Sequence, residues 1–134
     1  MSNIKDWKEE DLFNWLKDTT YPDLEKAKSR YSRHDCISKE KELFIELKCR
    51  RKHYDTLLIE KKKYDSILNK ALQNNAKAIY ICSTPEGIWY FNLKEITLNW
   101  ETNYLNPKTT DFTNNNRVPK EVSYIPLEFG KKLL

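Results

Sequence analysis

The stretch from Leu43 to Cys49 constrains the fold most, because its residues alternate between two faces as they do in a β-strand. Every second residue, starting from Leu43, is apolar, so this face requires a hydrophobic core. Phe44, Glu46 and Lys48 point to the opposite face, where a carboxylate and an ammonium group become neighbours. A sheet can form without such a pair. Taken alone, the two charges are best explained as a solvated strand face.

A second carboxylate strengthens the case for a chemical site. Asp35 precedes Glu46 by eleven residues and lies near the end of the preceding predicted strand, which spans residues 31–37. Two carboxylates can hold a divalent cation, and a lysine beside them can contact a water molecule and a phosphate group. Asp35, Glu46 and Lys48 are therefore the candidate residues for metal-dependent cleavage of a phosphodiester bond.

The composition fits one folded domain with a mildly basic surface. The 134 residues suffice for one domain with a core, and 13% aromatic residues argue against disorder. Charged residues make up 33% of the chain and the net charge is +4, which permits a nucleic-acid partner without requiring one.

Neither a membrane partner nor a disulfide framework is expected. No apolar run reaches the roughly 18 residues of a membrane span, and the first seven residues lack the apolar core of a signal peptide. The three cysteines are an odd number without disulfide spacing, which predicts buried free thiols and a cytoplasmic location. A zinc site from His34, Cys36, Cys49 and His53 is not expected either, because the usual Cys-x-x-Cys half is missing.

The apolar pattern predicts alternating helices and strands. The expected elements are a helix at 6–17, strands at 31–37 and 42–50, a helix at 54–73, a strand at 76–83 with a hairpin partner at 88–93, and an edge strand at 121–127. Asp6 and Glu9 would form the capping box of the first helix. Residues 22–28 suit either a helical turn or the approach to the first strand, and residues 109–116 suit a loop.

These elements predict a central mixed β-sheet flanked by helices, as in a mixed α/β sandwich or an α+β layer fold. The helix at 54–73 would join two strands by a right-handed crossover. No internal repeat or second-domain boundary is visible, so we expect a single domain over residues 1–134. Its core would span about residues 5–95. Residues 96–134 would form an extension that caps the core, mediates dimerisation or contacts substrate.

With these residues and this element order, the chain resembles the PD-(D/E)XK nuclease superfamily, which has the restriction-endonuclease-like fold. The core of that family is a helix, three strands, a helix and a strand, and its signature is an acid followed at some distance by acid-any-lysine. Asp35, Glu46 and Lys48 match the signature. His34 stands where the family name has a proline, and any additional first strand would lie upstream, around residues 28–37.

The resemblance implies a role for each residue of the signature. Asp35 and Glu46 would bind Mg²⁺ or Mn²⁺, with the Leu47 main-chain carbonyl as a third ligand. Lys48 would position the attacking water and stabilise the transition state. Whether Lys48 acts as a base or only orients the water is left open by the sequence.

Residues on either side of the signature are expected to bind substrate. Glu60 and Tyr64 resemble a variant of the Gln-x-x-x-Tyr motif of the RecB and lambda-exonuclease branch, with Glu60 in place of the glutamine. Four residues apart in the predicted helix, they would reach the same side of the cleft, although plain surface and core roles explain them as well. Arg50, Arg51 and Lys63 belong to the densest basic region and would neutralise phosphates without reading base sequence.

Two further groups of residues have weaker cases. Some members of the family place an additional acid on the first helix, and Glu10 or Glu25 would take that role here. Trp89, Tyr90 and Phe91 suit stacking on unpaired bases, but packing explains them better.

Together these features predict a Mg²⁺- or Mn²⁺-dependent nuclease that hydrolyses phosphodiester bonds in DNA with Asp35, Glu46 and Lys48. Its small size leaves no room for a separate recognition domain. This favours action as a homodimer on duplex or branched DNA, or as a structure-selective nuclease. Two alternatives stay open: a non-catalytic nucleic-acid-binding or assembly protein on the same fold, and an RNA endonuclease with the same site.

Overall fold

The computed structural model describes residues 3–27, 34–105 and 118–134, and these ranges contain two α-helices and nine β-strands. The helices are α1 (Glu9–Thr19) and α2 (Lys61–Gln73), and short 3₁₀ turns lie at Ile4–Asp6, Leu93–Glu95 and Leu127–Phe129. The strands are β1 (Glu25–Lys26), β2 (Asp35–Ser38), β3 (Leu43–Cys49), β4 (Thr56–Glu60), β5 (Lys77–Thr84), β6 (Gly87–Asn92), β7 (Glu101–Leu105), β8 (Val118–Pro126) and β9 (Lys131–Lys132). Within those ranges, no helix has the length and apolar character needed to cross a membrane.

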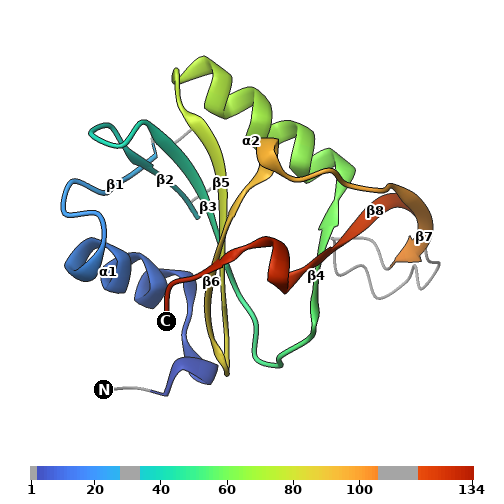
Figure 1. The fold of residues 1–134 in the computed structure, drawn as a ribbon, viewed down its shortest axis with the longest axis horizontal. Helices are drawn as coiled ribbons and strands as arrows, with labels where there is room; N and C mark the ends of the chain where they lie inside the picture. The colour runs from blue at the N-terminus through green and yellow to red at the C-terminus, as the bar shows by residue number, and fades with distance from the viewer. Residues whose placement is uncertain (1–2, 28–33, 106–117) are drawn as a thin grey trace, which may run out of the picture.

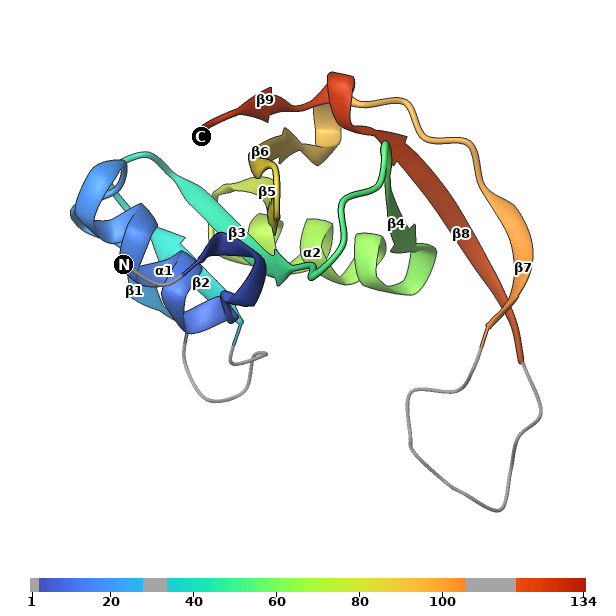
Figure 2. The same ribbon diagram turned by 90° about the horizontal axis from the view of Figure 1, so that it is seen from below.

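A six-stranded mixed sheet forms the centre of the molecule, with strand order β1-β2-β3-β5-β6-β9. β3 and β5 run parallel in the middle, and the other neighbours in this sheet are antiparallel. α1 covers one face and α2 the other (Figure 1). A second sheet of order β4-β8-β7 extends from the α2 side, and β7 and β8 project away from the centre (Figure 2). The predicted central mixed sheet flanked by helices is confirmed.

Helix α1 begins later than its sequence pattern predicts. The Asp11 side chain accepts a hydrogen bond of 2.9 Å from the Lys8 main-chain N–H, which caps the helix at Lys8. The predicted Asp6–Glu9 capping box is wrong, because Asp6 lies in a separate 3₁₀ turn that ends before the helix starts. As a result Glu9 becomes the first residue of α1.

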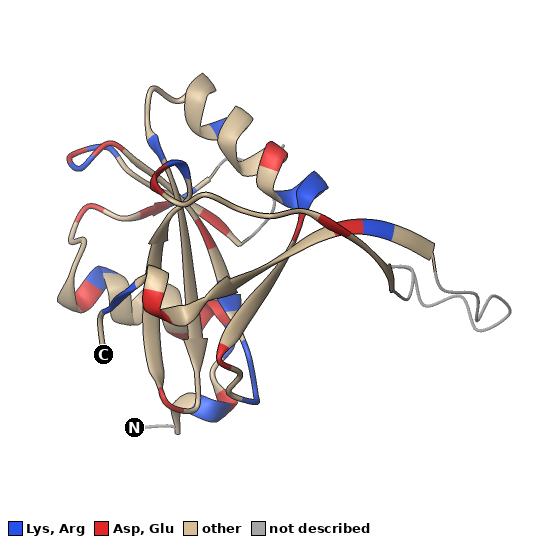
Figure 3. Ribbon diagram, turned by 45° about the vertical axis from the view of Figure 1, so that its right-hand side comes forward, with Lys and Arg blue, Asp and Glu red and all other residues tan. Residues whose placement is uncertain are grey.

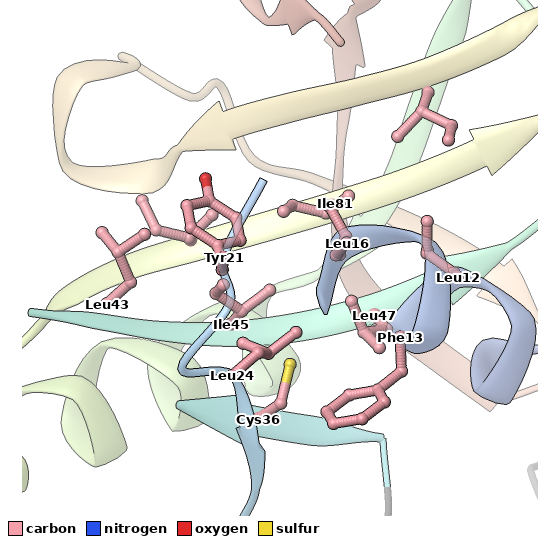
Figure 4. Close-up of a cluster of buried hydrophobic side chains, with 12 residues drawn as sticks. Leu12, Phe13, Leu16, Tyr21, Leu24, Cys36, Leu43, Ile45, Leu47 and Ile81 are labelled. Carbon is pink, nitrogen blue, oxygen red and sulfur yellow. The ribbon is translucent and has the colours of Figure 1, made fainter. Parts of the chain in front are cut away.

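The central strands separate two apolar cores, as the alternation of β3 predicts. On the α1 side, Leu12 and Leu16 pack against Ile45, Leu47 and Ile81 (Figure 4). The core on the α2 side gathers side chains from β3, β4, α2, β5, β6 and β8, among them Phe44, Leu57, Ile67, Ala78, Phe91 and Ile125. Seven of the eight residues of β5 are buried, as expected of a strand covered on both faces.

The helix predicted over residues 54–73 is wrong in its first part. Residues 56–60 form strand β4, in which Leu57 and Ile59 are 1% and 2% exposed, and the helix starts only at Lys61. β4 is stabilised by pairing with β8, more than sixty residues later, and a local pattern cannot report such a partner. Leu72 of this helix does not join the core, because it is 73% exposed.

The C-terminal part of the chain is more integrated than an extension. The strand predicted at the sheet edge, residues 121–127, is instead β8, the central strand of the second sheet. Pro126 is tolerated because it is the last residue of β8, paired with Thr56 at the end of the ladder. β9 closes the edge of the large sheet beside β6. The loop predicted at 109–116 and residues 31–33 of the predicted first strand lie outside the described residues.

Of the two options that the sequence leaves for residues 22–28, the structure favours the approach to a strand over a helical turn. Residues 25–26 form the short strand β1, which pairs with β2. Cys36 and Cys82 are buried and Cys49 is partly buried, and all three thiols are free, as predicted.

Candidate active site

Asp35 and Glu46 lie directly opposite each other on the neighbouring strands β2 and β3. Leu47 N donates a hydrogen bond of 3.1 Å to His34 O, so the pair next to it, Asp35 and Glu46, is one without mutual main-chain hydrogen bonds. In such pairs the Cα atoms are only about 4.5 Å apart and the side chains are closest. The two carboxylates are 1% and 4% exposed. The register of the sheet therefore brings together two acids that are eleven residues apart in sequence.

Two lysines of helix α2 neutralise this buried pair. Lys63 Nζ lies 2.5 Å from Glu46 Oε1, and Lys70 Nζ lies 3.1 Å from Asp35 Oδ2. Lys63 and Lys70 are seven residues apart, about two helical turns, so both project from the same side of α2. Lys63 is predicted from the sequence to bind substrate, whereas Lys70 is not among the predicted site residues. The spacing of seven residues indicates that Lys63 and Lys70 share one side of a helix. Only the fold shows that this side of α2 faces the two acids.

Burial is the main cause that raises the pKa of Glu46 to about 7, and the neighbouring Asp35 carboxylate raises it further. The Lys63 ammonium group opposes the rise. The Oε2 atom of Glu46 is buried and receives no hydrogen bond from the described residues. A carboxylate with a raised pKa and an unused oxygen is poorly stabilised by its surroundings, so an additional cation at this position would relieve it.

Lys48 lies on the same face of β3 as Glu46, two residues further along the strand, and its side chain is exposed. Both residues line a cavity of about 360 Å³ on the α2 side of the sheet. Among the described residues, no carboxylate forms an ion pair with Lys48, in contrast to Lys63 and Lys70. Its ammonium group is therefore free to contact a ligand in the cavity.

A second cavity of about 390 Å³ is lined by Asp35 and adjoins the first, because Glu9, His34 and Leu47 line both. Glu9 is thus an acid of α1 at the candidate site that is not among the site residues predicted from the sequence. The sequence pattern assigns Glu9 to a capping box, and only the packing of α1 on the sheet shows that it lines both cavities.

The two upstream acids suggested by the sequence are less well placed than Glu9. Glu10 also lines the cavity beside Asp35, but it forms an ion pair with Lys26. Glu25 is exposed on β1 and lines neither cavity. Glu9 is therefore the better candidate for an additional acid.

Glu60 and Tyr64 do not occupy one helix side as predicted, because Glu60 is the last residue of β4. Glu60 does line the cavity that contains Glu46, and its carboxylate pairs with Lys120 Nζ at 2.7 Å. Tyr64 packs on the core of the α2 side, with its ring centroid 5.2 Å from that of Trp100. Of these two residues, only Glu60 therefore lines the candidate site, and it does so from a strand end.

Only some of the basic and aromatic residues that were predicted to contact substrate lie at the candidate site. Arg50 lines the cavity with Glu46, whereas Arg51 is exposed in the bend after β3 and lines no cavity described here. The basic first turn of α2 appears as a blue segment (Figure 3). Phe91 is 0% exposed, so stacking on a base is excluded for it.

The donor set of the site suits a hard divalent cation better than zinc. Among the described residues, no group of three or more His, Cys, Asp or Glu side chains could hold a metal ion, so an ion here would have fewer protein ligands than a closed four-ligand zinc site. The pair of buried carboxylates offers the oxygen ligands that Mg²⁺ prefers, usually one or two from the protein with water and substrate completing the shell. The residues present therefore fit a magnesium-type ion, with Lys63 and Lys70 supplying positive charge at the same carboxylates.

No protein-family model matches the sequence, and no curated protein matches it significantly. Among solved structures, the chain is similar to Archaeoglobus fulgidus Hjc, a Holliday junction resolvase from an archaeal hyperthermophile. The superposition covers 93% of this chain and 88% of Hjc, with a TM-score of 0.58 and 15% sequence identity. The similarity confirms the restriction-endonuclease-like fold predicted from the sequence.

Proposed function

We propose that this protein is a metal-dependent nuclease that hydrolyses phosphodiester bonds in DNA. The observation that carries the proposal is the face-to-face placement of the buried Asp35 and Glu46 carboxylates, with Lys48 lining the same cavity as Glu46. The arrangement lies on the fold of a Holliday junction resolvase, which adds independent support. Neither the charge pattern nor the fold alone would be sufficient, because many proteins share each of them.

Asp35 and Glu46 would hold Mg²⁺ or Mn²⁺, and the resemblance adds the Leu47 carbonyl as a third ligand. Glu9 lines both adjoining cavities but does not form a three-acid metal group with Asp35 and Glu46, so its carboxylate would contact the ion through a water molecule. When bound, such an ion polarises the phosphoryl oxygens and lowers the pKa of water. Lys63 and Lys70 balance the negative charge of the pair before the ion enters.

Lys48 would act on the substrate directly. Its exposed ammonium group can donate hydrogen bonds to the attacking water and to the scissile phosphate, and can offset the negative charge that grows in the transition state. Arg50 and Lys63 line the same cavity and would bind neighbouring phosphate oxygens.

The proposal is tested by cleavage of labelled linear, nicked, branched and single-stranded DNA with Mg²⁺ or Mn²⁺. We expect cutting that EDTA abolishes and that Lys48→Ala lowers at least about 100-fold, which is typical when a group that stabilises the transition state is removed. Lys94→Ala is the matched control, since Lys94 is exposed and lines none of the cavities described. Circular dichroism confirms that both variants are folded.

Other outcomes would redirect the assignment. Cutting of RNA in preference to DNA, in a direct competition, would make the protein a ribonuclease with the same site. Binding without cutting under every metal tried would favour a non-catalytic nucleic-acid-binding or assembly protein. The homodimer expected from the small size stays a prediction that sedimentation velocity can check.

A further inference from the structure

A separate cavity of about 350 Å³ has an unusual charge composition. Its charged residues are the three lysines Lys41, Lys77 and Lys131, and no carboxylate lines it. Four other cavities of the described residues each include at least one Asp or Glu in their lining. Uncompensated positive charge in a concave site attracts an anion, because the surrounding protein concentrates the field there.

Several distant segments build this cavity, so it is a product of the fold. Lys77 at the start of β5 is the register partner of Leu43 in β3. Lys131 of β9 is the register partner of Tyr90 in β6. Tyr21 follows the end of α1 and is held there by a 2.7 Å hydrogen bond from its N–H to Leu16 O. Lys41, in the turn before β3, completes the set.

The lysines around this cavity are available for a ligand. None of the three forms an ion pair with a carboxylate in residues 3–27, 34–105 or 118–134. Each is exposed, so a ligand can reach its ammonium group from the solvent. Glu40 and Glu42 flank Lys41 in sequence, but neither lines the cavity.

Two phenol groups add hydrogen-bond donors to the positive charge. The Tyr21 ring packs beside Leu43 in the core, and its hydroxyl points away from the other labelled apolar side chains (Figure 4). Burial raises the pKa of Tyr21 to about 12, so the hydroxyl keeps its proton at neutral pH and can donate a hydrogen bond to an anion. Tyr90 lines the same cavity and its pKa is raised as well, mainly by burial.

The cavity is distinct from the candidate active site. It lies at the beginning of β3, next to Leu43, whereas Glu46 is three residues further along the strand, roughly 10 Å away. It also opens on the α1 side of the sheet, whereas the cavity lined by Glu46 and Lys48 lies on the α2 side. One bound phosphate group therefore cannot occupy both sites.

We propose that Lys41, Lys77 and Lys131, with the hydroxyls of Tyr21 and Tyr90, form a second binding site that takes a phosphate group. Three ammonium groups and two neutral hydroxyl donors match the charge and the acceptor oxygens of a phosphate. The phosphate can come from a nucleic-acid backbone, which would extend the proposed nuclease substrate across a second face, or from a small phosphorylated molecule. The site itself does not depend on nuclease activity.

The test compares two triple variants with equal loss of charge. The first replaces Lys41, Lys77 and Lys131 by Gln, and the control replaces the exposed lysines Lys5, Lys39 and Lys94 by Gln, none of which lines the cavity. Inorganic phosphate is titrated into each protein while amide chemical shifts are followed by NMR. We expect saturable shifts of the Tyr21, Leu43 and Tyr90 amides in the wild type and the control, and none in the first variant. Where the triple variant is unfolded, Lys131→Gln and Lys94→Gln are compared.

A second measurement identifies the source of the phosphate. Affinity for a 20-base-pair duplex is measured in EDTA, where metal-dependent cleavage is absent, at about 0.1 M salt. Loss of one duplex phosphate contact weakens binding roughly eightfold at that salt concentration. If the first variant binds the duplex at least eightfold more weakly than the control variant does, the site binds the nucleic-acid backbone. Equal affinities with the NMR result intact assign it to a small phosphorylated molecule.

The proposal is overturned when saturating phosphate leaves the three amides of the wild type unshifted, or when both triple variants respond like the wild type. Cleavage with Mg²⁺ at saturating DNA is measured in parallel. If the wild type does not cleave DNA, the proposed nuclease function is contradicted. The phosphate titration would still test the second site, because it does not require cleavage.

Discussion

Replacing Glu46 by Gln should stabilise the metal-free protein while it removes a residue of the candidate active site. The ordinary pKa of this carboxyl group, 4.5, is raised to about 7 in the folded protein, mainly by burial. The folded state therefore binds more protons than the unfolded state between these pH values. Stability from this group is fully present below about pH 4.5 and is lost as the pH rises to about 7.

The difference between the two pKa values sets the size of the effect. It corresponds to about 3 kcal/mol of unfolding free energy that the wild type loses between acidic and mildly alkaline pH. Glu46 is 4% exposed, so solvent screening reduces this value little. A glutamine keeps an oxygen that can accept a hydrogen bond from Lys63, but forfeits the ionic part of that contact. We therefore expect Glu46→Gln to be more stable than the wild type by about 1–3 kcal/mol at pH 8, and by less at pH 5.

The assay is urea unfolding of both proteins at pH 5 and pH 8 in EDTA. Glu128→Gln, the same chemical change at an exposed residue, serves as the control and should shift stability by no more than about 0.5 kcal/mol. Mg²⁺ is then added at about 100 times its dissociation constant, which should stabilise the wild type by about 3 kcal/mol and Glu46→Gln much less. A variant less stable than the wild type at pH 8, with an unchanged pH dependence, would refute the reasoning.

Three further predictions concern the same structure. Lys70→Met removes the ammonium group that pairs with the buried Asp35 carboxylate and should destabilise the metal-free protein by about 3–5 kcal/mol in urea unfolding. Mg²⁺ should recover part of this free energy, whereas a loss below about 1 kcal/mol would contradict the ion-pair argument. Glu9→Gln should weaken Mg²⁺ binding about tenfold in calorimetry while Glu10→Gln leaves it unchanged, and equal effects would remove Glu9 from the site. Gly87→Ala should lower the free energy of unfolding by at least about 2 kcal/mol, because Gly87 has φ +150° and an added Cβ would lie 2.1 Å from the main-chain oxygen of Leu134. An unchanged melting temperature would contradict this prediction.

Part of the candidate site was readable from the chain because it depends on local periodicity. The alternation of β3 assigns Glu46 and Lys48 to one face whatever the rest of the protein does, since successive strand residues point to opposite sides. The acid at residue 35 was likewise found from its place in an adjacent strand. These three residues are a local pattern, and the structure places two of them directly opposite each other.

Other parts of the site depend on contacts between distant segments. The ion pair of Lys70 with Asp35 joins residues 35 positions apart, and no short motif encodes it. Glu9 reaches the site because α1 packs on the sheet, which brings its first residue to the cavities lined by His34 and Leu47. This packing joins segments far apart in the chain, and periodicity does not resolve it.

The sequence by itself determined the mixed α/β class, the two-sided burial of β5 and the acid-x-lysine face, because each follows from the spacing of apolar and charged residues. Only the tertiary structure decided that residues 56–60 form a strand and that β8 lies in the centre of a sheet. Both depend on the pairing of β4 with β8, and the energy of a strand pair comes from a partner far away in the chain. The cavity lined by Lys41, Lys77 and Lys131 has the same origin. Its residues share no motif and meet only when β3, β5, β6, β9 and the end of α1 are assembled.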